Sequence, residues 1–315
     1  MNNENQEPLI QALLADRRAD RRWRNIRFFA GFTLVVAAFV GLKGGSKDAA
    51  NARFAGTPYA SLVRISGEIG PGKAVSAAVL NPLLKRAFED KNSKGVLLLV
   101  NSPGGTPVQA TLIHDRILQL RKEHPDKHVV VVGEDTLASG AYLMSVAAEK
   151  IYVADGTVTG SIGVVSSGFG FDKALEHYGV ERRVFHAGVH KDRLDSFEPL
   201  SPEDAAKMNA LLEKVHTQFI DIVKAGRGTR LHGDDSTLFS GDFWTGDEAV
   251  QLGLADGIGD VTSVAEKEFH VQTFHEYSAP TPFWEQAIKK VTTSLSLNLE
   301  ELAQTSIEAK ADLNP

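Results

Sequence analysis

The chain contains no cysteine among its 315 residues. That absence excludes a thiol nucleophile, a zinc site built on thiolates and any disulfide bond. It suits an oxidising compartment but does not establish one. Apolar residues make up 43% of the chain, which is enough to bury a full core, and the length of 315 residues suggests one or two domains.

An excess of positive charge is also missing, since the formal net charge is −6. No global field therefore attracts nucleic acid, and we expect no nucleic-acid partner. The HExxH pattern of zinc peptidases is absent from the sequence. His186 and His190 have a metal-like spacing, but we expect them on a strand end and a glycine loop rather than on one helix face. The sequence thus predicts neither a metal nor another cofactor.

Long apolar runs are scarce as well, and one uncharged, mostly apolar run covers residues 28–42. As a helix it would span about 22 Å, short of a hydrocarbon core of about 30 Å, although flanking residues can extend its reach. Six arginines between Arg17 and Arg27 predict that the N-terminal side stays in the cytoplasm. A cleaved signal peptide and a buried core helix are the alternatives. We favour a membrane anchor at residues 26–43.

These features predict five segments along the chain. They are a cytoplasmic tail (1–25), a transmembrane anchor (26–43), a linker rich in small residues (44–58), a globular domain (59–275) and a C-terminal extension (276–315). Within the extension, apolar residues from Phe283 to Leu295 share one helical face. That helix would dock on the domain, on a membrane surface or on a neighbouring chain.

Apolar strands alternate with amphipathic helices through the globular domain. Residues 96–100 form a continuous apolar run, as expected of a strand buried on both faces. The alternation predicts a largely parallel α/β fold. Further strands are expected at 129–132, 151–153 and 184–185, and helices at 77–89 and 108–123.

A long helix is predicted from Ser201 onward. Pro202 stands at its first position, Asp204 completes a pair resembling a capping box, and Gly226 is expected to close its far end. Its apolar stripe predicts a core or subunit contact.

The residue types of a serine hydrolase occur in the middle of the chain. Ser139 precedes Gly140 where an apolar strand gives way to a helix, so the first helical amides lack intrahelical partners. Gly104 and Gly105 follow a neighbouring strand, and their amides could stabilise an oxyanion. Taken alone, Ser139 would be interpreted as an ordinary helix cap, because serine is common there.

A serine nucleophile also needs a base. ClpP-like proteases place a histidine soon after their serine, but the corresponding residues here, 159–165, include none. Lys191, in the polar loop GVHKD, is the best candidate, and the adjacent His190 is the second. A lysine acts as a base only when its surroundings lower its pKa toward neutrality. A polar loop cannot bury its own lysine, so packing against a neighbouring chain would be needed.

Five motifs in order carry a family resemblance: NSPGG, LASGAYL, TGSIGV, GVHKD and WTGDEAVQLGLAD. The arrangement resembles the signal peptide peptidase SppA family, in its short single-repeat form, over about residues 61–269. The resemblance implies a crotonase/ClpP-like strand–helix spiral and a serine–lysine dyad. It further implies bowl-shaped homo-oligomers in which adjacent protomers supply the serine and the lysine.

The resemblance also assigns roles to particular residues. Ser139 matches the nucleophile and Lys191 the general base, while Ser161 matches a hydroxyl that helps to hold the lysine. The turn at Gly104 and Gly105 matches the oxyanion loop, to which the amide of Gly140 would add a donor.

We therefore expect a membrane-anchored serine endopeptidase that degrades cleaved signal peptides or other peptides released from membranes. Its domain would lie on the periplasmic or extracytoplasmic side of the inner membrane. Its partners would be peptide substrates, the cytoplasmic membrane and further copies of the chain. The alternatives are a crotonase-like acyl-CoA enzyme, which would not need Ser139 as a nucleophile, and a non-catalytic scaffold of the same fold.

Overall fold

A computed structural model describes Gly31 and residues 57–278 of the chain. The chain divides after Pro58 into two units, and the elements described below belong to the second. The predicted tail, the anchor apart from Gly31, residues 44–56 of the linker and residues 279–315 of the extension lie outside the described residues. Among the residues described, no helix is both long and apolar enough to cross a membrane.

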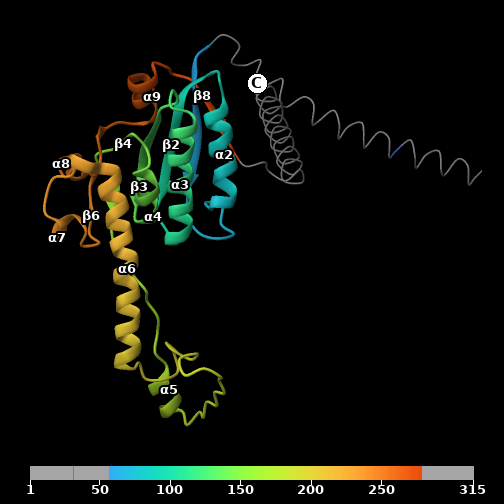
Figure 1. Cartoon of the computed structure of the whole chain (residues 1–315), viewed down its shortest axis with the longest axis vertical. Coiled ribbons are helices and arrows are strands. Elements are labelled where there is room, and N and C mark those ends of the chain that lie inside the picture. The colour runs from blue at the N-terminus through green and yellow to red at the C-terminus, as the bar shows by residue number, and fades with distance from the viewer. Residues whose placement is uncertain (1–30, 32–56, 279–315) are drawn as a thin grey trace, which may run out of the picture. The chain divides into compact units, whose positions relative to one another are not determined.

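The second unit is built on a sheet in which, over residues 57–278, six of the seven strand pairs are parallel (Figure 1). Six strands follow the order β6-β5-β3-β2-β1-β8, while β4 pairs with both β3 and β7. The described strands are β1 (Tyr59–Ser66), β2 (Ser93–Ser102), β3 (Val129–Ala138), β4 (Lys150–Val153), β5 (Val158–Gly160), β6 (Phe243–Trp244), β7 (Gly257–Ile258) and β8 (Phe274–Tyr277). This mostly parallel sheet confirms the predicted α/β class.

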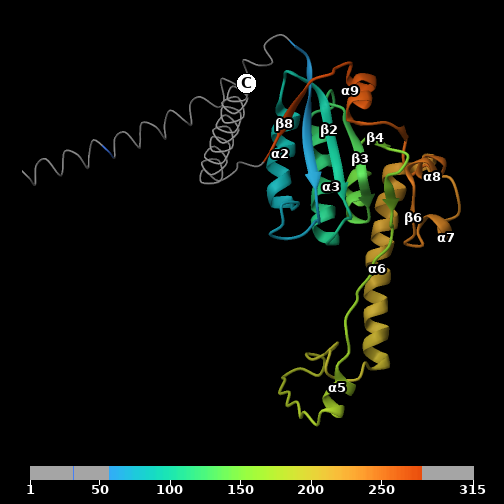
Figure 2. The same ribbon diagram turned by 180° about the vertical axis from the view of Figure 1, so that it is seen from behind.

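Helices connect the strands and cover the two faces of the sheet unequally (Figures 1 and 2). They are α2 (Ala77–Glu89), α3 (Pro107–Glu123), α4 (Gly140–Ser145), α5 (Asp172–His177), α6 (Pro202–Arg227), α7 (Asp235–Leu238), α8 (Gly246–Gln251) and α9 (Val261–Phe269), with a 3-10 turn at Gly228–Arg230. One face packs against α2, α3, α4 and part of α6, and α9 packs on the other.

Strand β2 shows why both faces are covered. Val96, Leu98 and Val100 belong to the larger core, whereas Leu97 and Leu99 belong to the core beneath α9. None of the five is more than 3% exposed. The prediction of a strand buried on both faces is therefore confirmed.

Helix α6 begins where the sequence predicts and ends two residues later than expected. The hydroxyl of Ser201 accepts a hydrogen bond from the Asp204 amide at 3.0 Å, which caps the helix. The expected stop at Gly226 is wrong, because Gly228, with φ of 57°, follows the helix instead. Gly226 serves close packing within the helix, since a Cβ there would lie 2.5 Å from the carbonyl oxygen of Val146 beside α4.

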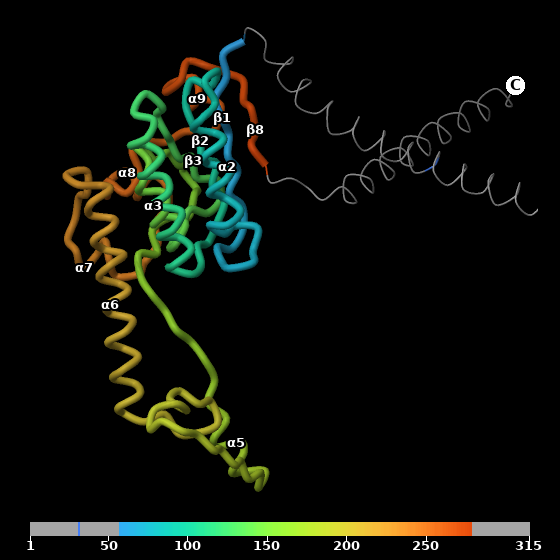
Figure 3. Tube along the Cα trace, turned by 45° about the vertical axis from the view of Figure 1, so that its right-hand side comes forward, coloured from blue at the N-terminus to red at the C-terminus, as the bar shows by residue number. Residues whose placement is uncertain are grey.

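Residues 164–201, which we call the arm, extend from the sheet and return to it through α6 (Figures 1 and 3). The predicted strand at 184–185 is wrong: the stretch is irregular, Phe185 is 93% exposed, and no strand within residues 57–278 pairs with it. Many apolar side chains of the arm are exposed, including Val165, Phe169, Phe171, Tyr178, Val180, Phe185, Val189, Leu194, Phe197 and Leu200. An apolar surface of this kind usually marks an interaction site.

A buried ion pair fastens the end of α6 to the sheet. The Arg227 guanidinium, whose side chain is 1% exposed, donates to both carboxylate oxygens of Asp256, at 2.6 and 3.1 Å. Asp256 also accepts the amide of Ile151 in β4 at 2.7 Å. Burial raises the pKa of the Asp256 carboxyl, but the hydrogen bonds and charge of Arg227, with further help from Ile151 and Arg230, outweigh burial and hold that pKa below its usual range.

Asp256→Asn is expected to lower the free energy of unfolding by about 3–5 kcal/mol, because the buried Arg227 charge loses its partner. In the wild type, the contribution of Asp256 is present above the usual carboxyl pKa of about 4 and is lost as pH falls through the lower folded pKa. The variant should therefore lose less stability on acidification. Urea unfolding at pH 7 and pH 3 measures both effects.

Asp235→Asn provides the matched control, since its partner Lys224 and its own side chain are solvent-exposed. A change below about 1 kcal/mol is expected there. Equal effects of the two substitutions would contradict the anchoring role of Asp256.

Candidate active site

Ser139 stands at the turn from β3 into α4. Its φ of 53° is positive, a conformation that costs a non-glycine residue about 1–3 kcal/mol. The Ser139 amide donates to the carbonyl of Gly160 at 2.9 Å and fixes the turn. Although Ser139 occupies the N-cap position of α4, its side chain makes no capping hydrogen bond. The ordinary interpretation of Ser139 as a helix cap therefore does not account for its hydroxyl.

The glycine turn after β2 packs directly against this hydroxyl-bearing turn. Gly104 and Gly105 have φ of 94° and 150°. A Cβ on Gly104 would lie 2.6 Å from the Gly140 amide nitrogen, and one on Gly140 would lie 3.2 Å from the Gly105 amide nitrogen. Because Gly140 is the first residue of α4, its N–H has no partner within that helix. The amides of Gly105 and Gly140 are thus neighbours beside Ser139, as the donors of an oxyanion hole must be.

Ile69 holds the glycine turn from beneath. Its N–H donates to the carbonyl of Gly104 at 2.8 Å, and its carbonyl accepts the Thr106 amide at 3.0 Å. A Cβ on Gly105 would lie 1.9 Å from that same carbonyl oxygen, so only glycine fits there. The peptide units on both sides of Gly105 are therefore fixed before any substrate arrives.

Ser161 lies in the loop that follows β5, on the other side of Ser139. It also has a positive φ, of 50°, and its N–H donates to the carbonyl of Asp242 at 2.7 Å. Gly160 before it has no room for a side chain, since a Cβ would lie 2.4 Å from the Trp244 ring. The structure thus places Ser161 at the same cavity as Ser139.

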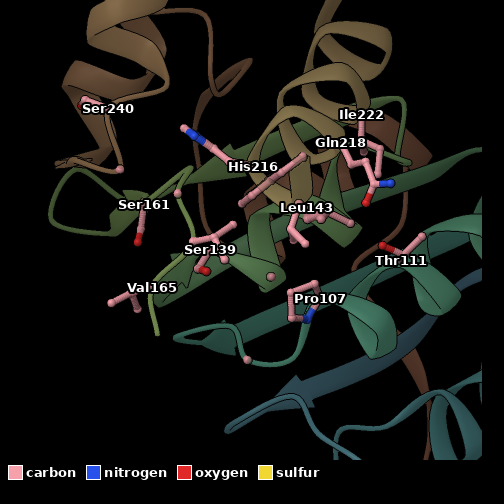
Figure 4. Close-up of a pocket in the computed structure, with 17 residues that line it drawn as sticks. Pro107, Thr111, Ser139, Leu143, Ser161, Val165, His216, Gln218, Ile222 and Ser240 are labelled. Carbon is pink, nitrogen blue, oxygen red and sulfur yellow. The ribbon is translucent and has the colours of Figure 1, made fainter. Parts of the chain in front are cut away.

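A cavity of about 400 Å³ opens at Ser139 and Ser161 (Figure 4). Its polar side chains are those of the two serines, Thr111, His216, Gln218 and Ser240. Its apolar wall comes from α3, α4 and α6 and contains Pro107, Leu143, Val215, Phe219 and Ile222. An apolar pocket with a few converging polar groups is typical of a ligand site.

Lys191 is placed elsewhere, in the arm. It is exposed and shares a hollow with Arg182, His186 and Asp192, and it does not line the Ser139 cavity. The described part of a single chain therefore unites Ser139, Ser161 and the three glycines but leaves Lys191 apart. His190, the second candidate base, contacts Arg193 through its Nδ1 at 2.9 Å and does not line the cavity either.

The loop that carries Lys191 is fastened to the start of α6. Arg193 donates to the Glu203 carboxylate at 2.5 Å and also forms an ion pair with Asp204, both in the first turn of the helix. His186 and Asp192 form a further pair across the loop, at 3.1 Å between Nε2 and Oδ2. The position of Lys191 is therefore tied to that of α6.

Comparison with known proteins decides the family. The model of peptidase family S49 matches residues 121–271, a stretch that contains Ser139, Ser161 and Lys191. A Synechocystis protein named as a protease is 32% identical over 197 residues, which cover 62% of this chain and 68% of that protein. The chain belongs to peptidase family S49. The resemblance to the SppA family inferred from the five motifs is thereby confirmed.

Other relatives of this S49 protein are longer than the chain. An Enterococcus faecium protein named signal peptide peptidase SppA is 34% identical over 176 residues, which cover 56% of this chain and 50% of that protein. A Brucella melitensis protein named Na(+)/H(+) antiporter NhaA is 45% identical over 213 residues, covering 66% of this chain but only 29% of that protein. The chain thus spans half or less of these two relatives, and the activity of either whole protein does not follow from the match.

One residue that lines the cavity, His216 on α6, was not singled out from the sequence. Its Nε2 lies 3.0 Å from the carbonyl oxygen of Ile162, in the loop that carries Ser161. Among the described residues that line the cavity, His216 is the only one with an ionisable side chain. The sequence offered a weak signal, because His216 interrupts the apolar stripe of α6 between Val215 and Phe219.

Proposed function

We propose that this S49 protein is a membrane-anchored serine endopeptidase that hydrolyses peptides through an acyl-enzyme on Ser139. The observation that carries the proposal is the hydroxyl of Ser139, which makes no capping hydrogen bond and lies beside the amides of Gly105 and Gly140. A crotonase/ClpP-like arrangement of the strands and helices is part of the same proposal, supported by the mostly parallel sheet and by family membership.

The proposed reaction uses these groups in turn. Oγ of Ser139 attacks the peptide carbonyl while the neutral amine of Lys191 accepts the hydroxyl proton. The N–H groups of Gly105 and Gly140 stabilise the oxyanion that forms. The C–N bond then breaks, and the leaving amine takes the proton from the lysine. Water attacks the resulting ester in the same manner and regenerates Ser139.

Lys191 would come from a neighbouring copy of the chain. Within one chain it is exposed and does not line the Ser139 cavity, so it needs both an apolar wall and a serine from elsewhere. The exposed apolar side chains of the arm supply a surface on which a second copy could pack. A homo-oligomer with sites at its subunit boundaries meets both needs.

The sequence supports the proposed location, and the cavity supports the proposed substrates. The arginines before residue 28 favour a domain on the extracytoplasmic side of the inner membrane, with residues 26–43 as the anchor. The apolar wall of the cavity suits peptides with apolar side chains, such as cleaved signal peptides. An acyl-CoA enzyme could use the same glycine turn, but it would leave the Ser139 hydroxyl without a role.

Two fluorophosphonate probes test the proposal on full-length protein in spheroplasts. In spheroplasts, a membrane-impermeant probe is expected to label one residue, Ser139. In inverted vesicles, only a membrane-permeant probe should label it. Peptide mapping by mass spectrometry identifies the adduct. Labelling at Ser161 or Ser166, or no labelling by either probe, would overturn the assignment of Ser139 as the nucleophile. Labelling by the impermeant probe only in inverted vesicles would show that the domain lies on the cytoplasmic side of the membrane.

A further inference from the structure

His216 connects the α6 wall of the cavity to the loop that carries Ser161. It extends from α6 toward that loop (Figure 4), and its Nε2 lies 3.0 Å from the carbonyl oxygen of Ile162. A carbonyl only accepts hydrogen bonds, so Nε2 must carry the proton of this contact. That nitrogen is therefore occupied and cannot accept a proton from Ser139.

The contact completes a set of four hydrogen bonds around Ser161. The Gly160 carbonyl accepts the Ser139 amide at 2.9 Å, and the Ser161 amide donates to Asp242 at 2.7 Å. The Ser161 carbonyl accepts the Gly163 amide at 3.0 Å. Since the Gly163 N–H and the Ile162 carbonyl belong to one peptide unit, His216 holds the unit whose other end is bonded to Ser161.

This support matters because Ser161 has a positive φ, a conformation that persists only when its surroundings impose it. The other three contacts come from backbone groups and are insensitive to side-chain substitution. The His216 contact is the one made by a side chain among these four, and it comes from the helix whose first turn holds the Lys191 loop through Arg193.

We infer that His216 is a positioning residue that fixes the direction of the Ser161 hydroxyl and, through it, the lysine amine that takes the proton from Ser139. The inference rests on the proposed function, and on the role in holding the lysine that the family resemblance implies for Ser161, and it deepens that function. His216 acts through its N–H donor and not as a base. A side chain that presents an N–H at the same place should therefore replace it.

Three variants of the full chain test this role by steady-state peptide hydrolysis. His216→Leu is expected to lower kcat by about 10- to 100-fold, as misplacement of a reacting group by about 1 Å can do, with KM within about twofold. His216→Gln, whose amide nitrogen can occupy the place of Nε2, should keep kcat within about threefold of wild type. His232→Leu, at an exposed histidine outside the cavity, is the matched control and should not change kcat.

A double-variant cycle separates positioning from a general structural effect. In a Ser161→Ala background, His216→Leu should cost little further activity, because the hydroxyl it positions is already gone. Fully multiplicative losses would show that His216 acts by another route and overturn the inference. If His216→Leu lowers the melting temperature markedly, His216→Phe replaces it, since Phe keeps an aromatic ring and lacks the N–H donor.

The remaining outcomes are equally decisive. If His216→Gln is as inactive as His216→Leu, an N–H donor does not replace the imidazole, and the proposed role through that donor is wrong. Unchanged kcat in a folded His216→Leu, with an active wild type, overturns this inference alone. A wild type that neither hydrolyses peptides nor reacts with the probe overturns the proposed function and the inference with it.

Discussion

Ser139→Ala is expected to lower peptide hydrolysis by at least about four orders of magnitude, because loss of a covalent nucleophile leaves only binding and oxyanion stabilisation. The fold should survive, since the hydroxyl does not cap α4 and the alanine keeps the Cβ of the turn. Hydrolysis of a fluorogenic peptide measures the rate, and the thermal melting temperature checks the fold.

Ser166→Ala is the control for this substitution, because Ser166 is exposed and does not line the cavity. Its rate should match that of wild type. Appreciable hydrolysis by a well-folded Ser139→Ala variant would show that another group attacks the substrate.

The position of Ser139 could be predicted because its determinants are local. An apolar strand that ends in Ser-Gly before small residues dictates a strand–turn–helix, and the structure has β3, Ser139 and α4 in that order. The start of α6 was equally accessible, since the Ser201 cap depends on residues within one turn. The end of α6 could not be predicted, because either Gly226 or Gly228 could end the helix as judged from the sequence. Only the structure shows that Gly226 packs against Val146.

Lys191→Ala is expected to be nearly as inactive as Ser139→Ala, because the serine then has no group to take its proton. His190→Ala should keep much of its activity, since His190 contacts Arg193 and not the cavity. Lys173→Ala is the matched control, an exposed lysine of the same arm. Wild-type activity in Lys191→Ala would remove the dyad from the mechanism.

Mixing the two inactive variants tests whether the dyad forms between chains. In a head-to-tail assembly of equal parts, about one quarter of the interfaces would pair an intact serine with an intact lysine, so up to about a quarter of the wild-type activity should return. Subunit exchange is verified with chains that carry different fluorophores. A mixture that stays inert despite full exchange would place the site within one chain.

The location of Lys191 relative to Ser139 could not be predicted from the residues alone. The motif GVHKD identifies the lysine, but the 26 residues of α6 and the arm before it determine how far it lies from the cavity. His216 was missed for a related reason. A histidine within an apolar helical stripe is usually a packed core residue, and its partner Ile162 is 54 positions away.

Helix α6 is a rigid spacer of fixed length. Its 26 residues are about 39 Å long at 1.5 Å per residue, and a hydrogen-bonded helix does not stretch. One part of this rod lines the cavity of its own chain, while its first turn holds the loop of Lys191. In the proposed assembly, the spacing between neighbouring sites would be set by this length. A neighbour that docked one helical turn out of register would miss its lysine by about 5.4 Å. Mispaired or partly assembled chains would then remain inert, which would confine proteolysis to correctly built particles.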